Sequence, residues 1–173
     1  MQILSSFKLI KTFAFDMDGV LTDGNIIVDA NNNWLRQMYI RDGYALQVAA
    51  RAGFNVIVIS GSNSSFVHYR LNKLGVKDVF MDVKNKEDFL TKFIAERKIS
   101  FSEMLFMGDD IPDYSCMKLA AISACPADAA FEIKEMASYI SPFDGGRGCV
   151  RDVIEKVLKL NNKWTLNNNI TST

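Results

Sequence analysis

Apolar residues along this chain occur in short runs separated by longer segments with helical periodicity. Continuous apolar runs lie at residues 12–15 (TFAF), 55–59 (NVIVI) and 104–107 (MLFM), and shorter ones at 79–81 and 121–124. Short continuous runs of this kind are typical of strands buried on both faces of a sheet. Strands that alternate with helices form βαβ units. The pattern therefore predicts an α/β fold with a doubly wound, mainly parallel sheet and helices on both faces.

The segments between and after these runs predict the helices. We expect helices at about residues 42–52, 64–74, 86–98, 112–119, 128–136 and 147–160. Asp42 is a candidate N-cap for the first of them, because a carboxylate can accept hydrogen bonds from the free N–H groups of a first turn. Gly53 and Gly75 follow the first and second helices, where glycine readily ends a helix.

Residues 24–40 (GNIIVDANNNWLRQMYI) depart from this alternation. They are interpreted as two short strands around a turn-forming cluster at 29–33, which predicts a β-hairpin between the first strand and the first helix. An isolated hairpin is marginally stable in water. Its apolar side chains are Ile26, Val28, Trp34, Leu35, Met38 and Ile40. We expect them to pack against another surface, and we favour a second subunit over the domain itself.

The length of 173 residues, with 49% hydrophobic and 23% charged residues, fits one globular core and is too short for two ordinary domains. We expect a single domain over residues 12–160. Residues 1–11, for which no element is predicted, are treated as an N-terminal extension. The Asn/Thr-rich residues 161–173 are expected to form a partly flexible tail with a frayed end.

Charge and targeting signals narrow the classes of function. The formal net charge is zero, with 20 basic and 20 acidic residues, which argues against broad nucleic-acid or anionic-membrane binding. No apolar run reaches the roughly 18 residues of a membrane span, and no signal peptide is recognisable. The three cysteines form no CxxC pair and are expected to be reduced, packed thiols. These features predict a cytoplasmic enzyme.

Polar side chains follow the predicted strands at their carboxyl ends. These side chains are Asp16, Asp18, Ser60, Asp109 and Asp110. A lysine, either Lys84 or Lys86, lies just before the third predicted helix. Ligands of doubly wound sheets bind outside the carboxyl ends of the strands, near the point where the strand order reverses. We therefore expect these groups to lie together on one rim.

The chemistry of this set is that of phosphoryl transfer. Carboxylates held close together favour a cation between them, and Mg²⁺ prefers oxygen ligands, here Asp16, Asp109 and the backbone carbonyl of Asp18. Ser60 and Lys86 can bind phosphate oxygens. Asp16 can attack phosphorus to give an aspartyl-phosphate, and Asp18 can serve as general acid and then base. The set predicts a Mg²⁺-dependent phosphatase.

Each residue also has an ordinary structural interpretation. An Asp after a strand is usually a turn or cap residue, a Ser-Gly pair is usually a turn, and an isolated lysine is usually a solvated charge. Asp110 and Asp113 could serve only as caps of the helix near Pro112. His68, the single histidine, is expected to be packed or exposed and not catalytic. The catalytic interpretation rests on the whole set occurring in order.

The motifs resemble those of the haloacid dehalogenase (HAD) superfamily, and more narrowly its capless, KdsC-like family of 3-deoxy-D-manno-octulosonate 8-phosphate (KDO 8-phosphate) phosphatases. Residues 16–23 (DMDGVLTD) match the DxDGVLTDG signature, and Ser60 with Gly61 resembles the second motif. Lys86 resembles the third-motif lysine, with Lys84 as the fallback, and residues 108–113 (GDDIPD) resemble the fourth motif. The resemblance covers most of residues 12–160.

The resemblance implies a Rossmann-like fold in which a β-hairpin flap replaces a cap domain. It also implies a homotetramer whose hairpins pack together and whose neighbouring subunits help close each active site. The backbone amides of Met17 and Asp18 would cradle the phosphoryl group, Ser60, Gly61 and Lys86 would bind it, and Asp110 and Asp113 would support the site. The substrates implied are phosphorylated eight- or nine-carbon keto sugar acids on the route to lipopolysaccharide or related surface sugars.

One residue departs from the family pattern. KDO 8-phosphate phosphatases usually carry an arginine after the second-motif glycine, where this chain has Ser62. A hydroxyl cannot replace a bidentate carboxylate partner. The candidates for that role are Arg41, Arg70, Lys73 and Arg147. KDO 8-phosphate remains the first expectation, with a nine-carbon keto acid phosphate or another small sugar phosphate as the alternative.

Two other classes of function were considered. A phospho-accepting receiver domain also combines acidic residues, a Ser/Thr and a lysine on a doubly wound sheet, but its phosphorylated Asp follows the third strand and its lysine follows the Ser/Thr late in the chain. Here the order is Asp16, Ser60, Lys86, Asp109, which disfavours a receiver. A catalytically idle binding subunit is disfavoured because every chemical position is filled.

Overall fold

The computed structural model describes residues 2–164, and its core is a six-stranded sheet with the order β5-β4-β1-β6-β7-β8. The strands are β1 (Thr12–Phe15), β4 (Asn55–Ile59), β5 (Asp78–Phe80), β6 (Met104–Met107), β7 (Ile122–Cys125) and β8 (Tyr139–Ile140). All neighbouring strands pair in parallel. The predicted fold class is confirmed, and β8 is an additional strand of two residues that the sequence pattern did not indicate.

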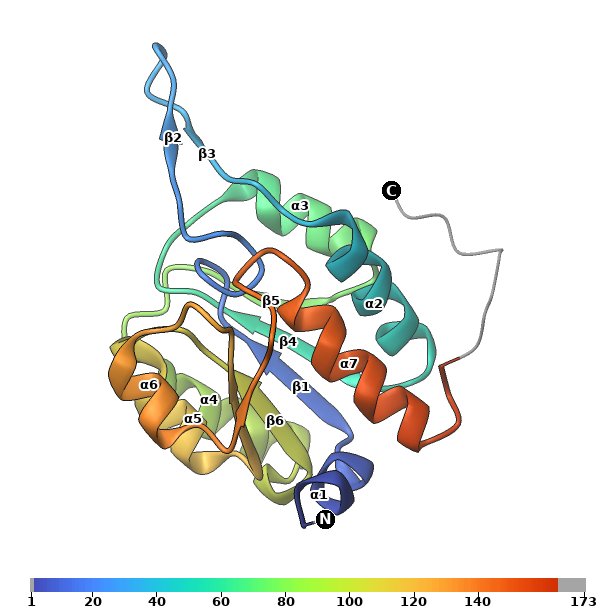
Figure 1. The fold of residues 1–173 in the computed structure, drawn as a ribbon. Coiled ribbons are helices and arrows are strands. Elements are labelled where there is room, and N and C mark those ends of the chain that lie inside the picture. The colour runs from blue at the N-terminus through green and yellow to red at the C-terminus, as the bar shows by residue number, and fades with distance from the viewer. Residues whose placement is uncertain (1, 165–173) are drawn as a thin grey trace.

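Helices cover both faces of the sheet (Figure 1). One face carries α1 (Gln2–Leu9), α2 (Ile40–Arg51), α3 (Ser65–Lys73) and α7 (Cys149–Leu160), and the other carries α4 (Lys86–Arg97), α5 (Tyr114–Leu119) and α6 (Phe131–Met136). Phe13 and Phe15 of β1 pack in the first layer and Ala14 in the second. This burial on both faces explains why β1 is a continuous apolar run.

Residues 2–11 contribute more to the core than the sequence pattern predicts. Helix α1 lies against α7, and Phe7 and Ile10 are buried. The Phe7 ring meets the Tyr139 ring edge to face, with 5.2 Å between centroids. A helix of about two turns carries too little periodicity to be recognised against its surroundings. The N-terminal extension is therefore part of the packed domain.

The Asp42 cap prediction is wrong for α2 but identifies a real contact. Helix α2 begins at Ile40 with Tyr39 as its N-cap residue, so Asp42 lies inside the first turn. Its carboxylate instead accepts hydrogen bonds from the backbone N–H groups of Gly148 (3.1 Å) and Arg151 (2.7 Å). Asp42 thus satisfies free N–H groups at the start of α7, where no side chain of the local sequence does so.

Other element boundaries shift by one to three residues. Strands β5 and β7 are displaced by one residue from the predicted ranges. The helix predicted at 112–119 is divided into a 3₁₀ turn, η2 (Ile111–Asp113), and α5, and a second 3₁₀ turn, η1 (Phe101–Glu103), precedes β6. Helices α6 and α7 begin at Phe131 and Cys149, later than predicted. Loop residues with local side-chain or backbone hydrogen bonds replace the missing first turns.

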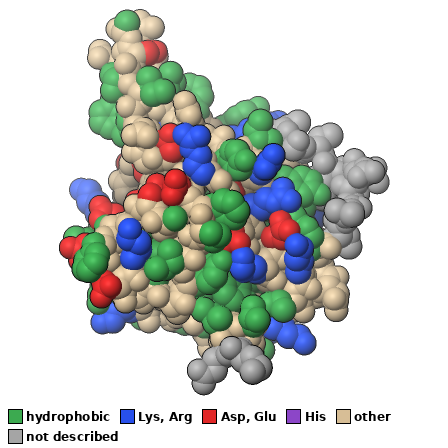
Figure 2. All heavy atoms as spheres, viewed as in Figure 1, with side chains coloured by type: hydrophobic (Ala, Val, Ile, Leu, Met, Phe, Trp, Pro, Cys, Tyr) green, Lys and Arg blue, Asp and Glu red, His purple; other side chains and the backbone are tan. Residues whose placement is uncertain are grey.

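The predicted hairpin is present and projects from the body of the domain (Figure 1). Strands β2 (Ile27–Val28) and β3 (Trp34–Leu35) pair antiparallel, and a bridge between Thr22 and Met38 closes the base. Figure 2 shows hydrophobic side chains gathered on this projection. Its exposed apolar side chains are Ile26, Ile27, Val28, Trp34 and Leu35. The domain's own surface does not cover them, which leaves the expected subunit partner as a prediction.

Three smaller predictions concern the rest of the chain. The three cysteines are buried and free, as expected for packed thiols. No helix within residues 2–164 is long and apolar enough to cross a membrane. The predicted fraying of the tail falls on residues 165–173, outside the described residues.

Candidate active site

The carboxyl ends of the central strands bring the predicted polar residues to one rim. Strand β1 lies between β4 and β6, so the strand order reverses there and a crevice forms beyond the strand ends. Asp16 follows β1 directly, and Asp109 follows β6 by two residues. They line a cavity of about 260 Å³, whose other lining residues are Asp18, Gly24, Lys86, Asp110, Pro112 and Asp113.

Lys86 is the cation at the centre of this site. Its ammonium donates hydrogen bonds to the carboxylates of Asp16 (Nζ–Oδ1 2.6 Å) and Asp113 (Nζ–Oδ1 2.7 Å). The Lys86 side chain is only 8% exposed, whereas Lys84 is exposed to solvent. The geometry therefore selects Lys86 over Lys84 as the lysine of the site. Lys86 is the first residue of α4, whose N-cap Asn85 accepts a hydrogen bond from the Asp88 N–H.

Three carboxylates surround this single ammonium group. Oxygens of Asp16, Asp109 and Asp113 lie within 4.8 Å of one another. Burial and the charge of Asp113 raise the pKa of Asp16 to about 7, although Lys86 opposes the shift. Burial and the charges of Asp16 and Asp113 raise the pKa of Asp109 to about 8. The three carboxylates carry more negative charge than one lysine can balance. A divalent cation that prefers oxygen ligands would supply the additional positive charge.

This cluster shares two of its three residues with the metal ligands expected from the sequence. Asp16 and Asp109 belong to both sets, while the clustered third carboxylate is that of Asp113 and not that of Asp18. The sequence predicts that Asp113 either supports the site or only caps a helix. Its side chain is buried, and its carboxylate accepts hydrogen bonds from the Lys86 ammonium and, at 3.2 Å, from the Asp109 N–H. The expected ligand from Asp18 is its backbone carbonyl, which remains a prediction.

Gly19 allows the loop after β1 to approach Asp109. Its φ of +85° lies in the left-handed region, and a Cβ atom at this position would overlap the Asp109 carboxylate. Only glycine combines this backbone conformation with so close a contact. The Gly in the DMDG segment therefore brings the two acidic strand ends together.

The Asp18 carboxylate is bound by residues from the hairpin and the β4 end. Arg36, which directly follows β3, donates from Nε to Oδ1 (2.7 Å) and from Nη2 to Oδ2 (3.1 Å). Ser62 donates to Oδ2 at 2.6 Å and Thr22 to Oδ1 at 3.3 Å. Burial raises the pKa of Asp18, but the hydrogen bonds from Arg36 and Ser62 outweigh it and leave the pKa below its usual range.

Arg36 and Ser62 were not identified as members of the site from the sequence. The available signal for Arg36 was a basic residue that lies, with Gln37, between the apolar side chains of Leu35 and Met38. Ser62 had been noted only as a departure from the family pattern. The Arg36 contact depends on where the base of the hairpin lies beside the strand ends, and the Ser62 contact joins the loops after β1 and β4. Local sequence specifies neither contact.

Ser60 and Gly61 lie at the end of β4, beside the catalytic cavity. Ser60 is buried, and its Oγ accepts a hydrogen bond from the Ser62 N–H at 3.1 Å. Gly61 lines an adjoining cavity of about 450 Å³ together with Lys86 and Pro112. Met17 is fully buried, and its carbonyl accepts the N–H groups of the tight loop that follows. Phosphate binding by Ser60, Gly61 and Met17 remains a prediction.

The remaining acidic and basic candidates have different surroundings. Asp110 is exposed, and its carboxylate accepts from the Ile111 N–H at 2.8 Å, so it caps η2 as the structural interpretation expected. Lys73 lies over the Tyr69 ring at 5.4 Å on the exposed side of α3. Arg70 lines a cavity of about 290 Å³ beside the hairpin. His68 is exposed on α3 and does not line the cavity that holds Asp16.

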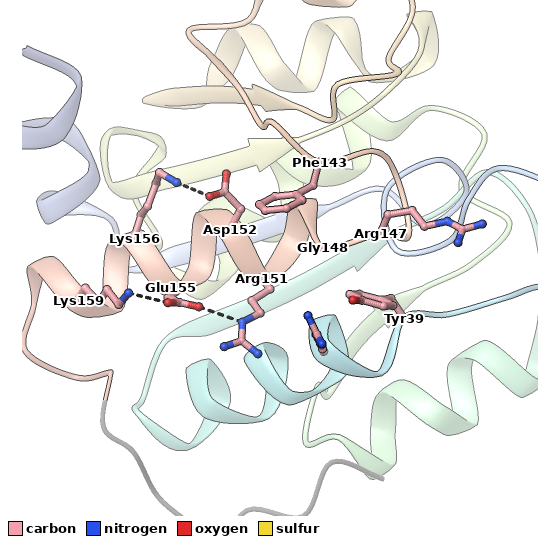
Figure 3. Close-up of a pocket in the computed structure, with 10 residues that line it drawn as sticks. Tyr39, Phe143, Arg147, Gly148, Arg151, Asp152, Glu155, Lys156 and Lys159 are labelled. Atoms are coloured by element: carbon pink, nitrogen blue, oxygen red, sulfur yellow. Dashed lines mark hydrogen bonds and ion pairs between the residues drawn. The ribbon is translucent and has the colours of Figure 1, made fainter.

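Arg41 and Arg147 line a separate cavity of about 430 Å³ over α7. Figure 3 shows Arg147 at one end of it and Lys159 at the other. Glu155 lies between Arg151 and Lys159 and pairs with both, and Asp152 pairs with Lys156 (Figure 3). The four predicted substrate-binding cations thus lie in three places, and none lines the cavity that holds Asp16.

Comparisons of the sequence with known proteins find relatives over most of the chain. A family model described as haloacid dehalogenase-like hydrolase matches residues 75–152. The 3-deoxy-D-manno-octulosonate 8-phosphate phosphatase KdsC of Escherichia coli (strain K12) is 29% identical over 156 residues, covering 90% of this chain and 83% of that protein. The Haemophilus influenzae KdsC is 28% identical over 162 residues, covering 94% and 88%.

Solved structures extend the similarity to the whole fold. The 3-deoxy-D-manno-octulosonate 8-phosphate phosphatase of Moraxella catarrhalis, solved with magnesium, phosphate and KDO, is 31% identical with a TM-score of 0.90 over 94% of each chain. The cobalt-bound Haemophilus influenzae phosphatase is 27% identical with a TM-score of 0.85, covering 91% of this chain and 92% of that one. The chain belongs to the haloacid dehalogenase superfamily and, within it, to the 3-deoxy-D-manno-octulosonate 8-phosphate phosphatases, a family of phosphoric monoester hydrolases.

Proposed function

We propose that this protein is a Mg²⁺-dependent phosphatase of a phosphorylated keto sugar acid, with KDO 8-phosphate as the first candidate substrate. The observation that carries the proposal is the buried arrangement of Lys86 between Asp16 and Asp113, with Asp109 in the same cluster. Such a cluster at the strand-order reversal is suited to binding a phosphoryl group together with a cation. The family of the chain supplies the class of substrate.

In the proposed reaction, Asp16 is the nucleophile. A carboxylate oxygen of Asp16 forms a bond to phosphorus while the ester oxygen of the sugar leaves and takes a proton from Asp18. Asp18 then removes a proton from water, whose oxygen attacks phosphorus and releases inorganic phosphate and free Asp16. Lys86, Ser60 and the backbone amides at Met17 and Asp18 hold the phosphoryl oxygens during both steps.

Mg²⁺ would be held by the carboxylates of Asp16 and Asp109 and by the backbone carbonyl of Asp18. When bound, it supplies positive charge that neutralises these carboxylates and the phosphoryl oxygens. The raised pKa values of Asp16 (about 7) and Asp109 (about 8) support this assignment, because they reflect burial and mutual repulsion without a second cation. Asp113 acts from the other side by fixing Lys86.

We also propose that the protein works as a cytoplasmic homotetramer assembled through the hairpin. The support is the exposed apolar surface of the hairpin, on which Trp34 is 60% and Val28 57% exposed. Exposed apolar patches of this kind mark subunit interfaces in soluble proteins. A nine-carbon keto acid phosphate or another small sugar phosphate is the alternative substrate, because Ser62 stands where the family usually has arginine.

The substrate proposal is tested by measuring phosphate release from a panel of sugar phosphates with Mg²⁺. The panel should contain KDO 8-phosphate, a nine-carbon keto acid phosphate, neutral hexose 6-phosphates and p-nitrophenyl phosphate. We expect kcat/KM to be highest for one of the keto acid phosphates and to depend on Mg²⁺. Equal kcat/KM values for acids and neutral sugars would contradict the substrate class, and no release from any ester would contradict the activity.

A further inference from the structure

We infer that Arg36 is a specificity-determining residue whose guanidinium leaves Asp18 and binds the carboxylate of the substrate's sugar acid. The inference rests on the proposed function and deepens it. It starts from the two salt-bridging contacts between Arg36 and Asp18, which join the hairpin to the proposed acid/base residue.

The Asp18 carboxylate has no acceptor site left in the free protein. A carboxylate offers about four lone-pair positions on its two oxygens. Arg36 Nε and Thr22 Oγ1 donate to Oδ1, and Arg36 Nη2 and Ser62 Oγ donate to Oδ2. Asp18 can take up the proton that it delivers to the leaving-group oxygen only when one of these donors withdraws and frees a lone pair.

Arg36 is the donor that can withdraw. Thr22 and Ser62 belong to the loops after β1 and β4, where both are also bonded to neighbouring groups of the same loops. Arg36 belongs to the hairpin, which consists of two residue pairs and a single bridge at its base. Arg36 reaches Asp18 through its long side chain from the base of the hairpin, so the guanidinium can turn to another partner without disturbing the strand ends.

The guanidinium is built to bind a carboxylate. Its side chain is 2% exposed, and it contacts both oxygens of Asp18 in the fork geometry that arginine offers to carboxylate groups. Lys86, the cation that lines the cavity holding Asp16, already contacts Asp16 and Asp113. Arg36 lines the neighbouring cavity and contacts Asp18 from that side, so it is the fork-shaped donor beside Asp18 for a second anionic group on a substrate.

Ser62 provides the space for this arrangement. Arg36 Nη2 lies 3.2 Å from Ser62 Oγ, so the guanidinium occupies the volume directly beside the position 62 side chain. A small hydroxyl at position 62 accepts from Arg36 and donates to Asp18 at the same time. The hairpin thereby supplies the cation that position 62 does not carry.

Two events then coincide when substrate binds. The sugar-acid carboxylate replaces Asp18 as the partner of Arg36, so the buried guanidinium is never left unpaired. One oxygen of Asp18 becomes available to the ester oxygen. A neutral sugar phosphate lacks the group that draws Arg36 away, so it would be bound less well and turned over less often.

The test compares Arg36→Gln and Arg36→Lys with wild type on KDO 8-phosphate and on a neutral hexose 6-phosphate. The measured quantity is the ratio of kcat/KM for the acid to kcat/KM for the neutral ester. We expect Arg36→Gln to lower this ratio about 30-fold or more, mainly through KM for the acid, as loss of a charge-assisted bidentate contact implies. Arg36→Lys should restore part of it. Gln37→Ala, on the same hairpin and exposed, is the matched control and should leave the ratio within twofold.

A binding measurement makes the test independent of turnover. Calorimetry with KDO alone should give a dissociation constant that rises at least about tenfold in Arg36→Gln and stays unchanged in Gln37→Ala. Equal losses on the acid and the neutral ester, or unchanged KDO binding, would overturn the inference and leave Arg36 as a residue that only positions Asp18 or contacts the phosphoryl group. A wild-type enzyme without preference for the acid would overturn the substrate proposal as well.

Discussion

At the scale of single residues, Lys86 balances the buried charges of the site. Burial lowers the pKa of its ammonium, but Asp16 and Asp113 outweigh this and raise the pKa above its usual range. Lys86 therefore stays protonated at every pH at which the protein would work. Removing one partner of a buried charge cluster is costly because it leaves the other charges unpaired.

We expect Lys86→Met to lower kcat/KM at least about 100-fold and to reduce the free energy of unfolding by several kcal/mol, as loss of a buried ion-pair partner does. The matched control is Lys84→Met, two residues earlier and exposed, which should change both quantities little. Steady-state kinetics and urea unfolding provide the measurements. Similar losses in the two variants would contradict the assignment of Lys86.

The motif residues could be predicted from the sequence because each follows a strand end, and their order along the chain is diagnostic. Asp16, Lys86 and Asp109 meet in the structure as expected. Arg36 could not be predicted, because its contact with Asp18 joins the base of the hairpin to the loop after β1 and leaves no local pattern. The importance of Asp113 could not be predicted, because an Asp that only caps a helix and an Asp that pairs with Lys86 look the same in the sequence.

At the scale of elements, Asp42 links α2 to the start of α7. Burial raises the pKa of its carboxyl to about 6, although hydrogen bonds from the Arg151 and Gly148 N–H groups oppose the shift. The sequence pattern predicts a capping role for Asp42 within its own helix, since a cap supplied by another helix leaves no local pattern. The same limit applies to α1, whose packing on α7 is a tertiary contact.

The raised pKa of Asp42 predicts a pH dependence of stability. Because the folded-state pKa of about 6 exceeds the ordinary aspartate value of 3.8, the folded protein binds the proton more tightly, and protonation stabilises it. Relative to Asp42→Asn, wild type should therefore gain up to about 1.4 kcal/mol per pH unit as the pH falls from about 6 to about 4. Urea unfolding of both proteins across this range measures the difference. A difference that does not change with pH would contradict the assignment.

At the scale of the whole molecule, the fold class was predictable and the assembly is not visible in one chain. Runs such as β1 and β6, buried on both faces, specify a parallel sheet almost by themselves. The hairpin instead exposes Trp34 and Val28, and a partner subunit that covers them stays a prediction. An exposed hairpin of this composition is a liability unless a partner buries it.

The tetramer proposal predicts the effect of polar substitutions on the hairpin. We expect the double variant Val28→Ser, Trp34→Ser to dissociate to a smaller species, because it removes apolar area from a self-complementary interface. Phe131→Ser on α6 is the control, since Phe131 is 70% exposed but lies away from the hairpin. Light scattering after size-exclusion chromatography measures the mass. A monomeric wild type would contradict the proposal.

The central claim is that Asp16 attacks phosphorus. Its most direct test is Mg²⁺-dependent phosphate release from KDO 8-phosphate by wild type and by Asp16→Asn, with Asp29→Asn in the exposed hairpin turn as the control. Asparagine keeps the shape of the side chain but is a poor nucleophile, so we expect release to fall by at least about 10³-fold in Asp16→Asn. Wild-type circular dichroism and an unchanged rate for Asp29→Asn should accompany that loss. Substantial turnover by Asp16→Asn would contradict the account.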